Sequence, residues 1–196
     1  MRKEVKVLGL SYSQSQVGSY VVVLSERKGK RKLPIVIKAS DAQQIALKIE
    51  GMKSPRPLTH DLFKSVNDAY GVDLQEVYIY AVLEGIFYTK LVTSNGLETV
   101  ETECTAGDGI ALSIVYDCPL YASKEVLDIS GVRINDDGTD MENVEEDEEY
   151  EEVEEKETKR VVSIEDLQHM MEDALNNEEY EIAAEIRDRI IKLKGE

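Results

Sequence analysis

Apolar and polar residues alternate in several short stretches of the first 131 residues, and each such stretch predicts a β-strand. In the first half, the predicted strands are Lys3–Tyr12, Tyr20–Leu24 and Leu33–Ile37. In the second half, they are Val77–Leu83, Ile86–Val92 and Leu97–Glu103, with a further extended piece at Pro119–Ala122. Tyr20–Leu24 is apolar at every position, which predicts a buried strand.

A helical period of three to four residues follows each set of three strands. It predicts helices that begin near Ser40, Thr59, Asp108 and Lys124. Ser40 and Gln43 match a capping box, and Thr59 is the expected N-cap of its helix. Three strands and two helices thus occur twice, in residues 1–71 and 72–131. We interpret this as an internal duplication in one α+β domain, with a mixed or antiparallel sheet of six or seven strands carrying both helix pairs.

The C-terminal third has a different pattern. Residues 135–161 hold a block of glutamates and almost no apolar side chains, which predicts a disordered acidic linker. Residues 162–196 carry two apolar stripes at helical spacing, which predicts a helical hairpin. A hairpin of this size is not expected to be stable alone. Its apolar stripe should therefore be covered by the two helices packing on each other, by a second copy or by a protein partner. We therefore expect a domain at 1–134, a linker at 135–161 and a hairpin at 162–196.

The formal net charge of −17 belongs mainly to that linker. Residues 1–135 contain 16 acidic and 16 basic side chains, whereas residues 136–159 contain 14 acidic and 2 basic ones. The acidity therefore does not argue against nucleic-acid binding by the domain. We interpret the acidic run as a solubilising spacer, although it could also fold back on a basic surface. Two cysteines without a pairing motif, no apolar leader and no membrane span predict a cytoplasmic protein.

Candidate chemistry is concentrated where the predicted helices begin. Asp41, Asp61 and Asp108 are carboxylates that could hold a divalent ion, Mg²⁺ or Mn²⁺, for phosphodiester hydrolysis. Histidine ordinarily titrates near neutral pH, so His60 could act as a general acid or base, and Arg56 could bind a phosphate through two N–H groups. We predict these five residues as the catalytic set. Acidic residues in a first helical turn also complement the helix dipole, and Arg56 could simply anchor its turn, so the structural interpretations stay open.

A second candidate surface is the tip of the first predicted hairpin. It carries five basic residues, Arg27, Lys28, Lys30, Arg31 and Lys32. Such a cluster favours contact with a nucleic-acid backbone. A solvated charged turn explains it equally well.

Several motifs in residues 3–132 resemble the bifunctional nuclease domain family. The matching residues are Asp41-Ala42, Ile45-Ala46, the string Pro55–Leu62 (PRPLTHDL), Phe87-Tyr88, Leu91, Asp108, Ile110–Leu112, Pro119-Leu120, Val126-Leu127 and Gly131. Residues 164–194 resemble the UVR motif, an interaction hairpin shared by the UvrB and UvrC excision-repair proteins. That match rests on Leu167, Met171, Ala174, Tyr180-Glu181, Ala183-Ala184, Arg187-Asp188, Ile190 and Leu193.

The first resemblance implies an α+β fold and hydrolysis of DNA and RNA without strong sequence preference. The second implies that the hairpin tethers the nuclease to a protein partner, and homo-oligomers are a further expectation. The sequence departs from the family pattern at one place. Where the family usually has an Arg-x-Ser-Asp-Ala run, this chain reads Cys104–Gly109, which lacks both the arginine and the serine. The alternative is therefore a non-catalytic binding or scaffold protein in a DNA-repair or stress-response complex.

Overall fold

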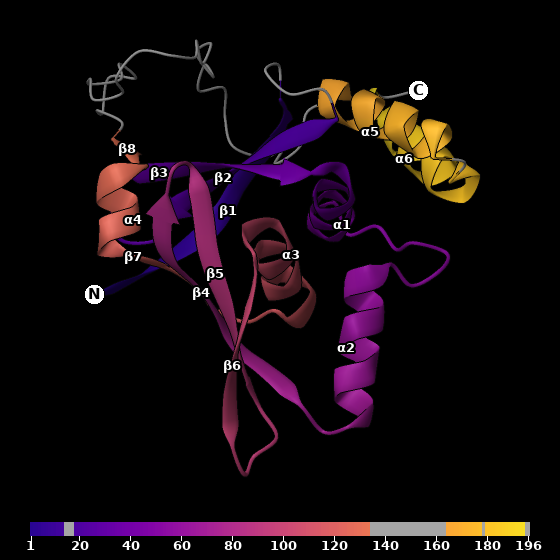
Figure 1. The fold of residues 1–196 in the computed structure, drawn as a ribbon. Coiled ribbons are helices and arrows are strands. Elements are labelled where there is room, and N and C mark those ends of the chain that lie inside the picture. The colour runs from indigo at the N-terminus through magenta and orange to yellow at the C-terminus, as the bar shows by residue number, and fades with distance from the viewer. Residues whose placement is uncertain (14–17, 134–163, 178, 195–196) are drawn as a thin grey trace.

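The computed structural model describes residues 1–13, 18–133, 164–177 and 179–194, and its described part is built on one mixed sheet of eight strands (Figure 1). The strands are β1 (Arg2–Tyr12), β2 (Ser19–Glu26), β3 (Arg31–Lys38), β4 (Asp73–Leu83), β5 (Ile86–Ser94), β6 (Thr99–Thr105), β7 (Leu120–Ser123) and β8 (Val132–Arg133). Their order across the sheet is β6-β5-β4-β7-β1-β2-β3-β8. Neighbouring strands are antiparallel except for the parallel pair β4 and β7.

Six helices are described: α1 (Ala39–Ile49), α2 (Thr59–Ala69), α3 (Ala106–Tyr116), α4 (Lys124–Ile129), α5 (Ile164–Asn176) and α6 (Tyr180–Lys194). Helices α1 and α3 pack against each other, and α2 packs against α3 (Figure 1). This arrangement confirms the predicted α+β fold. No helix in the described ranges is long and apolar enough to cross a membrane.

The same order of elements, three antiparallel strands and then a helix, occurs in β1–α1 and again in β4–α3. β7 joins the two sets: Leu120 pairs with Val5 on one side and with Val77 on the other, and all three side chains are buried. β7 corresponds to the extended piece predicted at Pro119–Ala122 and is the seventh strand, and β8 adds an eighth strand that was not predicted. A strand of two residues is too short to show an alternation in the sequence.

The second helix pair does not form as a pair. β7 separates α3 from α4, and α4 packs against β3, β4 and β7. The core lies between the sheet and the helices, and it takes alternate residues from each strand. Along β2, Tyr20, Val22 and Leu24 are buried, whereas Val21 and Val23 are only partly buried. The apolar run at Tyr20–Leu24 is therefore not buried at every position, because successive side chains of a strand point to opposite faces.

Two predicted helix starts are also corrected. α1 begins at Ala39, with Lys38 as its N-cap and no side-chain cap, because β3 runs directly into the helix. Ser40 lies inside the first turn, where its hydroxyl donates to Asp41 Oδ1 over 3.0 Å. The N-cap of α2 is Leu58 rather than Thr59, and the Leu58 N–H donates to Asp61 Oδ2 over 3.3 Å.

The predicted C-terminal hairpin is confirmed as α5 and α6, and it packs on the domain near β1 and α1. The Tyr12 N–H donates to Asp166 over 2.8 Å, and the buried Tyr20 hydroxyl donates to Asp173 over the same distance. The Tyr12 ring also stacks on His169, with centroids 4.3 Å apart. The apolar stripe of the hairpin belongs to the main core cluster. It is thus covered within the chain. The acidic linker predicted at 135–161 lies outside the described residues.

Candidate functional site

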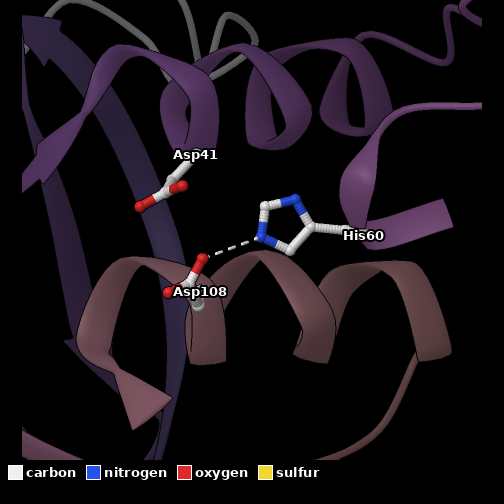
Figure 2. Close-up of side chains that lie close together, drawn as sticks. All are labelled: Asp41, His60 and Asp108. Carbon is white, nitrogen blue, oxygen red and sulfur yellow. Dashed lines mark ion pairs between the residues drawn. The ribbon is translucent and has the colours of Figure 1, made fainter. Parts of the chain in front are cut away.

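Three helices begin at the same place and bring three side chains together (Figure 2). Asp41 comes from the first turn of α1, His60 from that of α2 and Asp108 from that of α3. One potential ligand atom from each of them lies within 4.8 Å of the others. Ligand atoms on opposite sides of an ion bound at about 2.1 Å stand about 4.2 Å apart. Small side-chain rotations would therefore bring all three onto one divalent ion.

Each member of this cluster is held by its local structure. Thr105 is the N-cap of α3: its hydroxyl accepts from the Asp108 N–H over 3.2 Å and donates to Asp108 Oδ2 over 2.6 Å. This leaves Asp108 Oδ1 facing His60 Nε2 at 3.4 Å. Asp41 is fixed on one side only, by the bond from Ser40 to its Oδ1.

Two buried polar atoms of the cluster have no hydrogen-bond partner among the described residues. They are Asp41 Oδ2 and His60 Nε2, and their residues are 2% and 6% exposed. His60 Nε2 lies within ion-pair range of Asp108 but does not meet hydrogen-bond geometry. Burying a polar atom without a partner costs free energy, so such atoms commonly mark a place where a ligand binds.

The electrostatic environment of Asp41 favours the binding of a positive charge beside it. Burial raises the pKa of the Asp41 carboxyl above its ordinary value, and the nearby Asp108 carboxylate raises it further. Ser40, Lys38 and His60 oppose this shift of the pKa. The exposed Lys38 ammonium group also lies 3.9 Å from Asp108 Oδ2, at the solvent side of the cluster. A cation between the two carboxylates would relieve their repulsion.

Asp61 stands apart from the cluster although it follows His60 directly. Its carboxylate pairs with Lys48 Nζ at 2.9 Å and accepts hydrogen bonds from Leu58 N at 3.3 Å and Gln44 Nε2 at 3.5 Å. Burial by itself would raise the pKa of Asp61, but these donors hold it below its ordinary value. The geometry therefore gives Asp61 the role of tying the start of α2 to α1.

Comparison with known proteins places this chain in a family. A model of the bifunctional nuclease domain matches residues 22–135. The chain belongs to the bifunctional nuclease domain family. A model of the UvrB/UvrC motif matches residues 162–196. Uncharacterized proteins from two strains of Mycobacterium tuberculosis, CDC 1551 / Oshkosh and ATCC 25618 / H37Rv, are each 37% identical to this chain over 134 residues, which cover 68% of the chain and 79% of the relative.

The departure from the family's Arg-x-Ser-Asp-Ala run falls inside the cluster. Thr105 stands three residues before Asp108, where the run has its arginine, and it caps α3 instead of supplying a positive charge. Gly107 stands where the run has its serine. A Cβ atom at Gly107 would lie 2.2 Å from Asp41 Oδ2, so the glycine makes room for that carboxylate.

The other residues that the sequence suggested for catalysis or nucleic-acid binding lie outside the Asp41–His60–Asp108 cluster. Arg56 is exposed on the connection between α1 and α2. At the basic tip, Lys28 and Lys30 are exposed and Lys32 is partly buried. Arg27 pairs with Glu4. Arg31 pairs with Asp128 and, at 3.0 Å, with Glu26.

The tip is also far from the cluster. Arg31 and Lys38 are the two ends of β3, and a strand of that length spans about 23 Å. Lys38 lies beside Asp108, so the basic tip is at the other end of the sheet from the Asp41 cluster. A nucleic acid contacted at both places would have to extend along the molecule.

Sequence reasoning missed three residues that shape the site. Lys48 and the buried Gln44 hold Asp61, and Gly107 leaves space for Asp41. Gln44 lies on the opposite side of its helix from the apolar face, which is formed by Ala42, Ile45, Ala46 and Ile49. No signal in the sequence therefore indicated that Gln44 would be buried. Nothing local distinguishes Lys48 from an ordinary lysine in a last helical turn, where it would complement the helix dipole.

Proposed function

We propose that this protein is a metal-dependent nuclease that hydrolyses phosphodiester bonds of DNA and RNA with little sequence specificity. The observation that carries the proposal is the Asp41–His60–Asp108 cluster, with two buried polar atoms that lack hydrogen-bond partners among the described residues. The family match adds that the surrounding domain is of a nuclease type.

The donor set fits a divalent ion. One imidazole nitrogen and two carboxylates suit Mn²⁺ or a similar transition-metal ion better than Mg²⁺, which prefers oxygen ligands alone. When bound, such an ion lowers the pKa of a water ligand and neutralises charge that develops on the phosphate. In this proposal His60 takes the ligand place that the sequence suggested for Asp61.

The chain's own residues then supply orientation and charge. Asp41 and Asp108 provide negative ligand oxygens at fixed helix starts, and Lys38 is placed to contact a phosphate at the open side. First-turn residues of all three helices meet at the cluster, and the positive dipole ends of helix N-termini favour an anionic substrate there. A phosphate that approaches this region meets Asp108 first, because Asp108 is the most exposed of the three ligands.

The test is cleavage of labelled single-stranded RNA and DNA with EDTA, Mg²⁺ or Mn²⁺. Wild-type protein is expected to cleave best with Mn²⁺, and Asp41→Asn, His60→Gln and Asp108→Asn are expected to lose cleavage. Asp68→Asn is the matched control, because Asp68 is an exposed carboxylate of α2 that pairs with Lys64. Cleavage that persists in all three cluster variants would contradict the proposed site.

A second candidate function, a non-catalytic binding protein in a repair or stress complex, rests on Thr105. This residue replaces an arginine of the family run, so the cluster lacks that positive charge for a phosphate. Under this alternative, folded wild-type protein binds nucleic acid or a protein partner but cleaves nothing with any of the metal ions. The partner contact proposed for residues 164–194 would use the outward side of the hairpin, where Leu175, Tyr180 and Ile191 are 45%, 65% and 42% exposed.

A further inference from the structure

Helix α2 is amphipathic, but it presents its polar side to the protein and its apolar side to solvent. His60 is the one buried residue of this helix, and Lys64 lies with its Nζ 4.4 Å from the centre of the Tyr116 ring in α3. Leu62, Val66 and Tyr70, by contrast, are 57%, 47% and 81% exposed. An exposed apolar helix face is normally covered in the functional state of a protein.

The exposed face forms a continuous ridge. At about 100° per residue, Leu62, Phe63, Val66, Ala69 and Tyr70 lie within an arc of about 120° on the helix surface. His60 and Lys64 lie on the other side of the helix. No charged side chain falls within the arc. Leu62, Val66 and Tyr70 follow one another at intervals of four residues, the spacing that packs into the grooves of another helix.

A second group of exposed apolar residues lies at the tip of the β5–β6 hairpin, at the same end of the molecule as the C-terminal end of α2. Asp73, three residues after Tyr70, pairs with Ser94 near the end of β5, so both segments lie at the same end of the molecule (Figure 1). At this tip, Leu97 is 96% exposed and Val100 is 49% exposed. Together with those of Leu62, Phe63, Val66 and Tyr70, these exposures are equivalent to between three and four fully exposed large side chains. At roughly 150 Å² for a large side chain, that is on the order of 500 Å², against the roughly 800 Å² that each partner buries in a standard interface.

We propose that this surface, the α2 ridge with the β5–β6 tip, is the contact between two copies of this chain. An uncharged ridge is self-complementary, because two copies related by a two-fold axis can place their i, i+4 ridges in each other's grooves. The chain's own acidic segment is a poor occupant. It would bring many negative charges to a face that offers no cation, since the neighbouring Lys64 is already paired with Asp68.

Pairing through this face leaves the Asp41 cluster accessible. His60 points from the opposite side of α2, toward Asp108 (Figure 2). The proposal therefore does not rest on nuclease activity, and it moves the dimer contact away from the C-terminal hairpin.

The test is the molar mass of the full-length protein, measured by sedimentation equilibrium across the micromolar range. The wild type is expected to be a dimer, and Val66→Glu is expected to weaken dimerisation at least tenfold. Val36→Glu is the matched control, because Val36 is 46% exposed on β3 and Val66 is 47% exposed. Ile191→Glu, on α6, controls for association through the hairpin.

Tyr70→Glu is a second variant that should not disturb folding, because a residue that is 81% exposed contributes little to the stability of the monomer. It should weaken the dimer while circular dichroism and the melting temperature stay unchanged. A wild type that is monomeric throughout the concentration range would overturn the proposal. So would a dimer that dissociates with Val36→Glu or Ile191→Glu but persists with Val66→Glu and Tyr70→Glu.

Discussion

His60 Nε2 lies 3.4 Å from Asp108 Oδ1, although the two residues belong to different halves of the repeated fold. His60 opens the second helix of the first half, and Asp108 opens the first helix of the second half. The contact exists because α2 packs against α3, and it brings an imidazole and two carboxylates within reach of one ion.

Asp41→Asn is expected to abolish the binding of Mn²⁺ while it leaves the metal-free protein as stable as the wild type, or more stable. Asp41 is a buried acid beside a like charge, and the neutral amide removes the repulsion from Asp108. Titration calorimetry with Mn²⁺ and urea denaturation in EDTA measure the two effects separately. A strongly destabilised variant would show that Asp41 is a structural group.

The same carboxyl predicts a pH dependence. Because its pKa is raised on folding, the folded state binds the proton more tightly than the unfolded chain does. Its contribution to stability is therefore favourable below the unfolded pKa and is lost as the pH rises through the folded pKa. The stability gained by Asp41→Asn over the wild type should be largest at neutral pH and shrink toward about pH 4. A stability difference between Asp41→Asn and the wild type that is the same at neutral pH and at about pH 4 would contradict the raised pKa of Asp41.

Asp61→Ala is expected to destabilise the protein by about 1–3 kcal/mol, because it removes the Lys48 pair and the acceptor for the Leu58 N–H. The pKa of Asp61 is lowered on folding, so its contribution is present above the unfolded pKa and is lost as the pH falls through the folded pKa. Urea denaturation at neutral and acidic pH checks both statements. The Mn²⁺ affinity of the folded variant should equal that of the wild type. A large loss of affinity would mean that Asp61 is a metal ligand.

Gly107→Ala is expected to weaken Mn²⁺ binding at least tenfold with little loss of stability. The new methyl group would lie 2.2 Å from Asp41 Oδ2, and the carboxylate can turn away because only the Ser40 hydroxyl holds it. Calorimetry and the melting temperature report the two effects. Gly107→Ala with wild-type affinity would show that Asp41 does not need its present position to bind the ion.

Removal of residues 162–196 is expected to lower the melting temperature of the remaining domain. The hairpin covers the Tyr20 side of the core, and without it the Tyr20 hydroxyl loses Asp173 as its acceptor. Tyr20→Phe in the full chain isolates that hydrogen bond and should cost about 1 kcal/mol. A truncated protein with an unchanged melting temperature would mean that the hairpin does not pack stably on the domain.

The repeated order of strands and helices could be predicted because period-2 and helical patterns are local properties of the chain. The same holds for the candidates Asp41, His60 and Asp108, which belong to helix starts recognisable from the change of hydrophobic period and from the PRPLTHDL string, although Ser40 and Thr59 are not the N-caps. The two-residue strand β8 could not be predicted, and the position of β7 within the sheet could not be predicted either. The place of β7 depends on partners far along the chain, Val5 and Val77 on either side of Leu120.

The apolar spacing in α2 predicted a helix, but it could not say which side of the helix would be buried. That choice depends on packing: α3 receives the side with His60 and Lys64, and Leu62 and Val66 are left exposed. Asp61 and His60 differ for the same reason. They are neighbours in the chain, yet adjacent residues of a helix point about 100° apart, so one meets Lys48 of α1 and the other meets Asp108 of α3. Local patterns thus identified the helices and the candidate side chains, and long-range packing assigned each side chain its partner.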